Sequence, residues 1–271
     1  MKIGLALGGG GARGLADLGL LKAFREMDIP VHCVAGTSIG AIIGGVFAAG
    51  RMDPLLAWTA ESNWKKLPEL FFDPHLTSKS LISGNRIAKF LRRMIPADAF
   101  ADLAVPLAVV ATDLLAGEEV VLKEGVLHSA IRASMAIPGL FSPVAREGRI
   151  LVDGGMVDPL PVAVCRQMGA DCVIAVDLNL RHPDERAMDY DKLNVLSVID
   201  ETLRVVMNVA RKRNRPEDEP DLLLTPPVQD VKLLDFHKSA QLVAAGYDYA
   251  WRERARLKRF SRDPSGNAAE R

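Results

Sequence analysis

The chain of 271 residues is 49% hydrophobic and only 6% aromatic, so it can bury a core of alanine, valine, leucine and isoleucine in one large domain or two small ones. Its 34 lysines and arginines balance 34 aspartates and glutamates, and this net charge of zero argues against a nucleic-acid partner. No segment approaches the ~20 uninterrupted apolar residues of a membrane span. We therefore expect a cytoplasmic protein, at most peripheral to a membrane.

The first fifty residues carry two strand–turn–helix units. A buried strand is predicted at Lys2–Leu7 and a helix at Ala12–Met27, and the glycines between them interrupt the apolar run that a signal peptide would need. A second strand is predicted at Ile29–Ala35, followed by a helix of small residues at Ile39–Ala49. Two such units in succession predict a parallel sheet in an α/β fold. Further strands are expected at residues 107–112, 120–122, 150–152, 173–176 and 221–224.

Two regions interrupt this alternation. Residues 58–100 carry aromatic side chains and an amphipathic stretch, which fits either a lid over a substrate groove or a helical insertion on the surface. Residues 181–220 contain a predicted helix near Val195–Val209 that ends in a basic cluster, which fits either contact with lipid headgroups or a solvated helix end. We expect a single domain at residues 1–262 and a disordered tail at residues 263–271.

The three cysteines show no pattern of a disulfide or metal site. Cys33, Cys165 and Cys172 are odd in number, lie in apolar surroundings and form no CxxC pair. They are therefore predicted to be reduced core thiols, and no metal site is expected.

A glycine-rich loop joins the first strand to the first helix. It reads Gly8-Gly9-Gly10-Gly11-Ala12-Arg13-Gly14 and contains GxGxxG at Gly9, Gly11 and Gly14. Such a loop presents backbone N–H groups at a helix N-terminus and binds negative charge, either a phosphate or the oxyanion of a tetrahedral intermediate. The acidic residue of a dinucleotide site and the lysine of a P-loop are both missing, so a nucleotide cofactor is not expected.

The segment Gly36-Thr37-Ser38-Ile39-Gly40 matches GxSxG between a predicted strand and a helix. This is the setting of a nucleophile elbow, in which Gly36 and Gly40 permit a sharp turn and Ser38 is exposed at its tip. A serine that caps the following helix is the simpler alternative. The preceding strand favours the nucleophile.

A third motif, Asp153-Gly154-Gly155, follows the apolar residues 150–152. Alone, an Asp-Gly pair indicates a turn. Together with Ser38 and the glycine-rich loop, however, Asp153 completes a set of a nucleophile, an oxyanion cradle and a base, as acyl transfer requires.

These three motifs resemble those of bacterial patatin-like phospholipases. Further matches are residues 132–138 (RASMAIP), 158–161 (DPLP) and 235–238 (DFHK), and all of them follow the family order over about residues 1–250. The resemblance implies a three-layer fold with a mostly parallel central sheet flanked by helices. It also implies a lipid or ester substrate and no cofactor.

The resemblance further implies a Ser–Asp dyad of Ser38 and Asp153, with an oxyanion hole formed by Gly9, Gly10 and Gly11 beside Arg13. Asp17 stands where relatives commonly carry histidine. Because Asp17 follows Arg13 by one helical turn, we expect the two to pair.

Three alternatives remain open from the sequence. A Ser–His–Asp triad would need a histidine after residue 153, either His182 or His237. A catalytically silent membrane or regulatory scaffold would keep the fold without the chemistry, and a nucleotide-binding protein would use the glycine-rich loop for phosphate. The apolar residues Ile137, Leu140 and Phe141 and the aromatic residues of 58–72 are candidates for an acyl pocket. The sequence does not indicate an oligomeric state.

Overall fold

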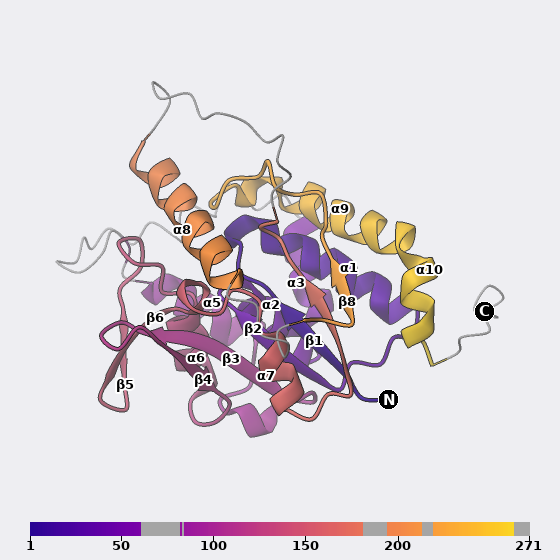
Figure 1. Cartoon of the computed structure of the whole chain (residues 1–271), viewed down its shortest axis with the longest axis horizontal. Helices are drawn as coiled ribbons and strands as arrows, with labels where there is room; N and C mark the ends of the chain where they lie inside the picture. The colour runs from indigo at the N-terminus through magenta and orange to yellow at the C-terminus, as the bar shows by residue number, and fades with distance from the viewer. Residues whose placement is uncertain (61–81, 83, 181–193, 213–218, 263–271) are drawn as a thin grey trace.

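The computed structural model describes residues 1–60, 82, 84–180, 194–212 and 219–262. Within them, eight strands form one sheet: seven follow the order β5-β6-β3-β2-β1-β7-β8, and the eighth, β4, also pairs with β3 (Figure 1). The strands are β1 (Ile3–Leu7), β2 (Cys33–Thr37), β3 (Leu107–Asp113), β4 (Glu118–Leu122), β5 (Val144–Arg146), β6 (Arg149–Asp153), β7 (Cys172–Val176) and β8 (Leu222–Leu224).

The core of the sheet is parallel, as predicted. β1 pairs in parallel with β2 and β7, β2 with β3, and β7 with β8, whereas β4 and β6 run antiparallel to β3. The four central strands β1, β2, β3 and β7 are almost continuously buried, because helices cover both faces of a parallel sheet. The predicted α/β fold with a mostly parallel sheet flanked by helices is confirmed.

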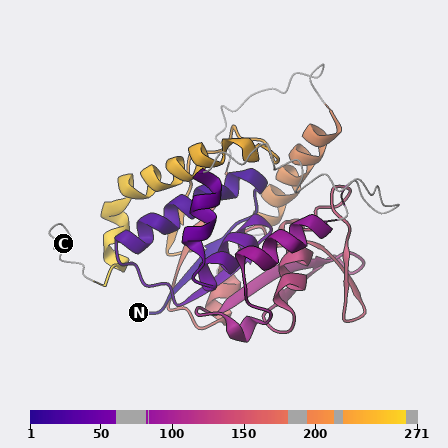
Figure 2. The ribbon, with the colours of Figure 1, turned by 180° about the vertical axis from the view of Figure 1, so that it is seen from behind.

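Side-chain size differs between the two faces of the sheet. Ile3, Leu5 and Leu7 alternate along β1 into the larger core cluster, whereas Ala6 faces a smaller cluster that contains residues of α7 (Val162–Gln167). Figure 2, seen from behind, shows the face of the sheet that carries the larger core cluster. Its covering layer includes the helices α1 (Leu15–Glu26), α2 (Ile39–Ala48), α3 (Met52–Ala60) and α9 (Ser239–Arg252).

The helix α9 lies directly against α1. A Cβ atom at Gly19 would collide with the carbonyl oxygen of Val243, and one at Gly246 would collide with that of Ala16. The two backbones therefore touch at a crossing that only glycine permits. This contact holds the last part of the described chain against the first helix.

Four further α-helices complete the described part of the fold. They are α5 (Asn85–Met94), α6 (Leu127–Ser134), α8 (Val195–Arg211) and α10 (Arg254–Leu257). Short 3₁₀ turns are η1 (Gly11–Gly14), η3 (Phe100–Asp102), η4 (Gly154–Met156), η7 (Phe236–Lys238) and η8 (Lys258–Phe260). Among the described residues, no helix is both long and apolar enough to cross a membrane.

Two predicted boundaries were displaced. The helix expected at Ala12–Met27 begins as the turn η1, because the glycine-rich loop continues to Gly14 before the α-helical pattern starts. The strand expected at Ile29–Ala35 is β2 (Cys33–Thr37), which extends through Gly36 and Thr37. The sheet therefore ends at Thr37, directly before Ser38, rather than three residues before it.

Candidate active site

Ser38 occupies a strained turn between β2 and α2. Its backbone dihedrals are φ 57° and ψ −121°, an arrangement that a side chain with a Cβ atom rarely adopts. Its amide N–H donates to the Ser134 hydroxyl at 2.8 Å, so α6 holds the turn from the side. Strain of this kind, maintained by surrounding contacts, is typical of a nucleophile elbow.

The motif glycines allow the backbone segments of the site to touch. A Cβ atom at Gly40 would collide with the carbonyl oxygen of Leu7, and one at Gly154 would collide with that of Val110. Three further motif glycines are equally crowded: a Cβ atom would meet Gly40 if placed at Gly36, Ile39 if placed at Gly14, and Met207 if placed at Gly155. These glycines bring the glycine-rich loop, the Ser38 turn and η4 within reach of one another.

Asp153 lies beside Ser38 because of strand register. Thr37 pairs with Val110 on β3, and the next residue of β3, Ala111, pairs with Asp153 on β6. Asp153 therefore lies at the same height along β3 as Ser38, although β6 and β2 do not pair with each other. The Ser38 hydroxyl donates to Asp153 Oδ2 at 2.6 Å, and the Gly155 amide donates to Oδ1 at 2.8 Å.

Burial changes the acidity of Asp153. The side chain is fully buried, and this desolvation raises the pKa of its carboxyl to about 6, while the hydrogen bonds from Ser38 and Gly155 act in the opposite direction. A carboxylate with this pKa is a stronger base than an ordinary aspartate, and it is ionised at neutral pH. The Ser38–Asp153 pair thus has the geometry and the charge state to move a proton from hydroxyl to carboxylate.

The amides of the glycine-rich loop differ in their hydrogen bonding. The amides of Gly8 and Gly9 donate to the carbonyl oxygens of Val176 and Pro159, each at 3.1 Å. Within the described chain, the structure shows no acceptor for the amides of Gly10 and Gly11, and Gly11 lines the same pocket as Ser38. Of the three amides predicted to form an oxyanion hole, that of Gly9 is already hydrogen-bonded and those of Gly10 and Gly11 are available.

Arg13 connects the loop to more distant elements. Its guanidinium is buried and donates to Val231 O at 2.7 Å and to Asp200 Oδ1 of α8 at 3.2 Å. The prediction that Arg13 pairs with Asp17 is wrong, since neither carboxylate oxygen of Asp17 has a hydrogen-bond partner. Asp200 also accepts from the Leu233 amide and lies in a position that a local sequence pattern cannot reveal.

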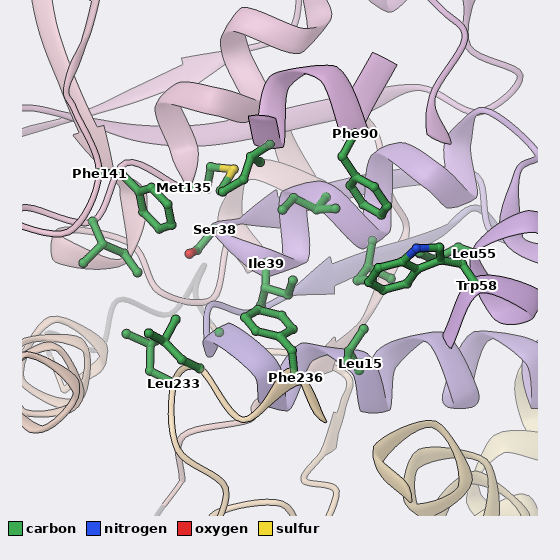
Figure 3. A pocket seen from close by; sticks show the side chains of 16 residues that line it. Leu15, Ser38, Ile39, Leu55, Trp58, Phe90, Met135, Phe141, Leu233 and Phe236 are labelled. Atoms are coloured by element: carbon green, nitrogen blue, oxygen red, sulfur yellow. The ribbon is translucent and has the colours of Figure 1, made fainter. Parts of the chain in front are cut away.

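An apolar pocket begins at Ser38 and extends between α2, α3 and α5. Figure 3 shows the Ser38 hydroxyl near Met135, Phe141 and Leu233, with Leu55, Trp58 and Phe90 farther along. About 780 Å³ of empty space lies between its walls, part of it open to solvent. The predicted lining residues Ile137 and Phe141 are in this wall, and Leu140 is instead buried in the core.

The aromatic residues of 58–72 can be compared with the structure only in part. Trp58 lines the pocket and stacks against Phe90, with ring centroids 5.0 Å apart and the rings tilted by 55°. Trp64, Phe71 and Phe72, like most of the predicted lid, lie outside the described residues. Whether 58–100 forms a lid stays a prediction.

No histidine of the described chain hydrogen-bonds to Ser38 or Asp153. His237 is exposed in η7, and His182 lies outside the described residues. His128 is buried and contacts the carbonyl oxygen of Ile95 at 2.9 Å. The three cysteines are free and buried, as predicted, and the described residues contain no cluster of side chains suited to a metal ion.

The comparison with known families decides the classification. A profile described as patatin-like phospholipase matches residues 5–166, which include the glycine-rich loop, the Ser38 turn and Asp153. The chain belongs to the patatin-like phospholipase family. The match starts within β1 and ends in α7, so it spans the elements that carry the glycine-rich loop, Ser38 and Asp153.

Relatives of this patatin-like chain are longer proteins. An uncharacterized NTE family protein of Mycobacterium tuberculosis is 42% identical over 178 residues, which cover 66% of this chain and 49% of that protein. Patatin-like phospholipase domain-containing protein 6 of Homo sapiens is 30% identical over 272 residues, covering 91% of this chain and 20% of that protein. The chain therefore spans about half or less of these relatives.

A solved structure shows the same fold at low sequence identity. VipD from Legionella pneumophila superposes with a TM-score of 0.51 at 15% identity, covering 93% of this chain and 66% of that one. At this identity the likeness concerns the patatin-like fold alone.

Sequence patterns missed several residues that shape the site. Ser134 lies in the matched segment RASMAIP, and a role for its hydroxyl would have been a reasonable expectation from that position. Met207 of α8 lies against both Gly9 and Gly155, and Asn179 after β7 binds the Gly9 carbonyl. Nothing in the sequence around Met207 or Asn179 indicated contact with the glycine motifs.

Proposed function

We propose that the protein is a serine acyl-ester hydrolase in which Ser38 and Asp153 act as a catalytic dyad on phospholipid or lysophospholipid acyl esters. The observation that carries this proposal is the 2.6 Å hydrogen bond from a strained, buried serine to a buried carboxylate at one end of an apolar pocket. Family membership supports lipid acyl hydrolysis as the reaction class.

The first chemical step is acylation of Ser38. As the Ser38 Oγ attacks the ester carbonyl carbon, its proton passes to Asp153 Oδ2, and the carbonyl oxygen acquires negative charge. The free amides of Gly10 and Gly11 are the proposed donors to this oxyanion. Collapse of the intermediate expels the alcohol, which takes the proton back from Asp153, and leaves an acyl-enzyme.

The second step is hydrolysis of that acyl-enzyme. Asp153 accepts a proton from water as the water oxygen attacks the acyl carbon, and the same two amides hold the second oxyanion. Collapse releases the fatty acid and returns the proton to Ser38. The positions of Asp153, Gly10 and Gly11 serve both steps, so no metal or cofactor enters the scheme.

The pocket wall supports an acyl chain as the part of the substrate that binds beyond Ser38. Apart from Ser38 and Gly11, every lining residue has an apolar or aromatic side chain, and burying each CH₂ group stabilises binding by about 0.8 kcal/mol. A lipid substrate also requires contact with a lipid surface, so we propose peripheral membrane contact.

A triad with His237 is the second candidate mechanism, and a silent scaffold of the same fold is the third. The exposed position of His237 and the direct Ser38–Asp153 bond favour the dyad. If the triad operates, the His237→Ala variant should lose hydrolysis. If the dyad operates, this variant should retain most of the wild-type activity. A scaffold requires no hydrolysis at all.

Covalent labelling tests the proposed function. We expect a fluorophosphonate probe to modify the wild-type chain at Ser38, located by peptide mass spectrometry, and to leave Ser38→Ala unlabelled. A panel of phospholipids, lysophospholipids and simple esters is then compared between the two proteins. Labelling at another residue, or equal lipid hydrolysis by Ser38→Ala, would show that Ser38 is not the nucleophile.

Trp58 is expected to limit the length of the acyl chain that the pocket accepts. Its ring stacks on Phe90 away from Ser38, so Trp58→Ala opens space for additional methylene groups. Each CH₂ newly buried is worth about 0.8 kcal/mol, so kcat/KM should rise by about fourfold per added carbon beyond the wild-type optimum. A series of p-nitrophenyl esters of increasing length measures this shift.

Trp251→Ala serves as the matched control for Trp58→Ala. Trp251 is partly exposed on α9 and does not line the pocket, so its removal should leave the chain-length optimum unchanged. If both variants keep the wild-type optimum, Trp58 does not contact the substrate.

A further inference from the structure

Asn179 follows β7 and reaches back to the glycine-rich loop. Its side chain is 5% exposed, and its Nδ2 donates to the Gly9 carbonyl oxygen at 2.7 Å. β7 lies beside β1 in parallel, with Val176 opposite Leu7, so the residues after both strands meet at the same edge of the sheet. No family motif identified in the sequence includes Asn179.

The partner of Asn179 belongs to the peptide that carries the Gly10 amide. In a planar trans peptide, the carbonyl oxygen of one residue and the N–H of the next point in opposite directions. A donor that fixes the Gly9 carbonyl therefore also fixes the direction of the Gly10 N–H. That N–H has no acceptor within the described chain and is one of the two proposed oxyanion donors.

The orientation of the Gly9–Gly10 peptide depends on a contact from outside the loop, because both residues are glycine. Neither Gly9 nor Gly10 has a side chain that restricts φ and ψ, so the peptide between them can rotate until a carbonyl replaces the N–H. The preceding amide, that of Gly9, is fixed by Pro159, but this bond leaves the next peptide free to turn. The hydrogen bond from Asn179 opposes this rotation.

Asn179 is itself held in place by neighbouring groups. Its backbone amide donates to Asp177 Oδ1 at 2.9 Å, and Asp177 Oδ2 forms an ion pair with Arg211 Nε at 3.0 Å. The Nδ2 atom also contacts the Met207 sulfur at 3.6 Å. Both Met207 and Arg211 belong to α8, so this helix supports the amide from behind.

We propose that Asn179 is a positioning residue for the oxyanion hole, acting through the Gly9–Gly10 peptide. The inference rests on the proposed function, because it assigns the Gly10 amide to the oxyanion. Loss of one oxyanion donor typically lowers the rate by ~10²–10³. Removal of the Asn179 amide should therefore lower kcat by about 10²-fold and leave KM within about threefold of the wild-type value.

A comparison of an ester with its thionoester tests this role directly. Sulfur is a weak hydrogen-bond acceptor, so an oxyanion donor stabilises the transition state of the oxygen ester far more than that of the thionoester. For Asn179→Ala, we expect kcat/KM to fall by about 10²-fold with the oxygen ester and by less than about threefold with the thionoester. A structural disturbance that moves Ser38 or Asp153 lowers both rates alike.

Two further variants complete the experiment. Asn179→Asp keeps the size of the side chain but cannot donate when ionised, so it should show the same selective loss even if Asn179→Ala does not fold. Asn194→Ala removes the amide that caps the far end of α8, and it should change neither rate.

The outcomes separate this inference from the proposed function. If wild-type enzyme hydrolyses the ester through Ser38 but the Asn179 variants lose both activities equally, or lose neither, then Asn179 does not position the oxyanion hole. If Ser38→Ala retains full activity, the proposed function itself fails.

Discussion

Replacing Asp153 with asparagine is expected to lower kcat for ester hydrolysis by at least about 10³-fold and to stabilise the fold at the same time. The amide keeps the shape of the side chain and can still accept from the Gly155 N–H, but it cannot take the proton of Ser38. Catalysis therefore loses its base while the packing around residue 153 is retained.

The gain in stability follows from the raised pKa of Asp153. The carboxyl has a pKa of about 6 in the folded chain and an ordinary value near 4 in the unfolded chain. Below pH 4 both states are protonated, and the carboxyl costs no stability. As the pH rises from 4 to 6 the unfolded state loses its proton first, which lowers the free energy of unfolding by on the order of 3 kcal/mol.

Urea denaturation of Asp153→Asn measures this effect. The variant should exceed the wild type in unfolding free energy by up to about 3 kcal/mol at pH 8 and match it near pH 4. In the wild type, kcat/KM should rise with pH through about 6, because only the ionised carboxylate accepts the proton. Ser38→Ala is the control, since it abolishes activity but leaves the carboxyl in place. An active Asp153→Asn would rule out the dyad.

The order of strands and helices near the N-terminus was predictable because local patterns determine it. The apolar run of β1 ends at a glycine and that of β3 at the polar Thr112, and parallel pairing follows from the helices between the strands. The end of β2 was misplaced because Gly36 and Thr37 look like turn residues. They are strand residues because Gly36 pairs with both β1 and β3, and Thr37 pairs with β3.

The active-site residues were predictable, but their relative positions were not. The motifs identified Ser38 and Asp153 as separate candidates, whereas their 2.6 Å contact depends on the register of β3 with both β2 and β6. The polar contacts that support the glycine-rich loop join residues that lie still farther apart in the sequence. Arg13 binds Asp200 and Gly9 binds Asn179, and in each case the partner lies more than 160 residues away.

Asp17 is the clearest case in which local reasoning failed. Its spacing from Arg13 suited an ion pair, but Asp200 supplies the acceptor instead, and Asp17 is left fully buried with neither oxygen hydrogen-bonded. Desolvation raises the pKa of this carboxyl well above its ordinary value. Asp17 lies in the first turn of α1, where the helix dipole stabilises negative charge only weakly. This stabilisation is smaller than the free-energy cost of burying the charged carboxylate.

Replacing Asp17 with asparagine is therefore expected to stabilise the protein in a pH-dependent way. A buried group with a raised pKa contributes stability at low pH and loses that contribution as the pH rises toward the folded value. Asparagine cannot ionise, so Asp17→Asn should raise the unfolding free energy at pH 8 by at least about 1 kcal/mol. The difference from the wild type should disappear near pH 4, where aspartate is protonated in both states.

Urea denaturation between pH 4 and pH 8 measures this difference, with Asp248→Asn as the control. Asp248 is exposed on α9, so its replacement should change the unfolding free energy by less than about 0.5 kcal/mol at any pH. Hydrolysis by Asp17→Asn should stay close to the wild-type rate, since Asp17 contacts neither Ser38 nor Asp153 through a hydrogen bond. A variant less stable than the wild type at pH 8 would mean that the folded chain stabilises the charged form of Asp17. The buried carboxylate would then have a binding partner, and Asp17 would support the loop through that contact.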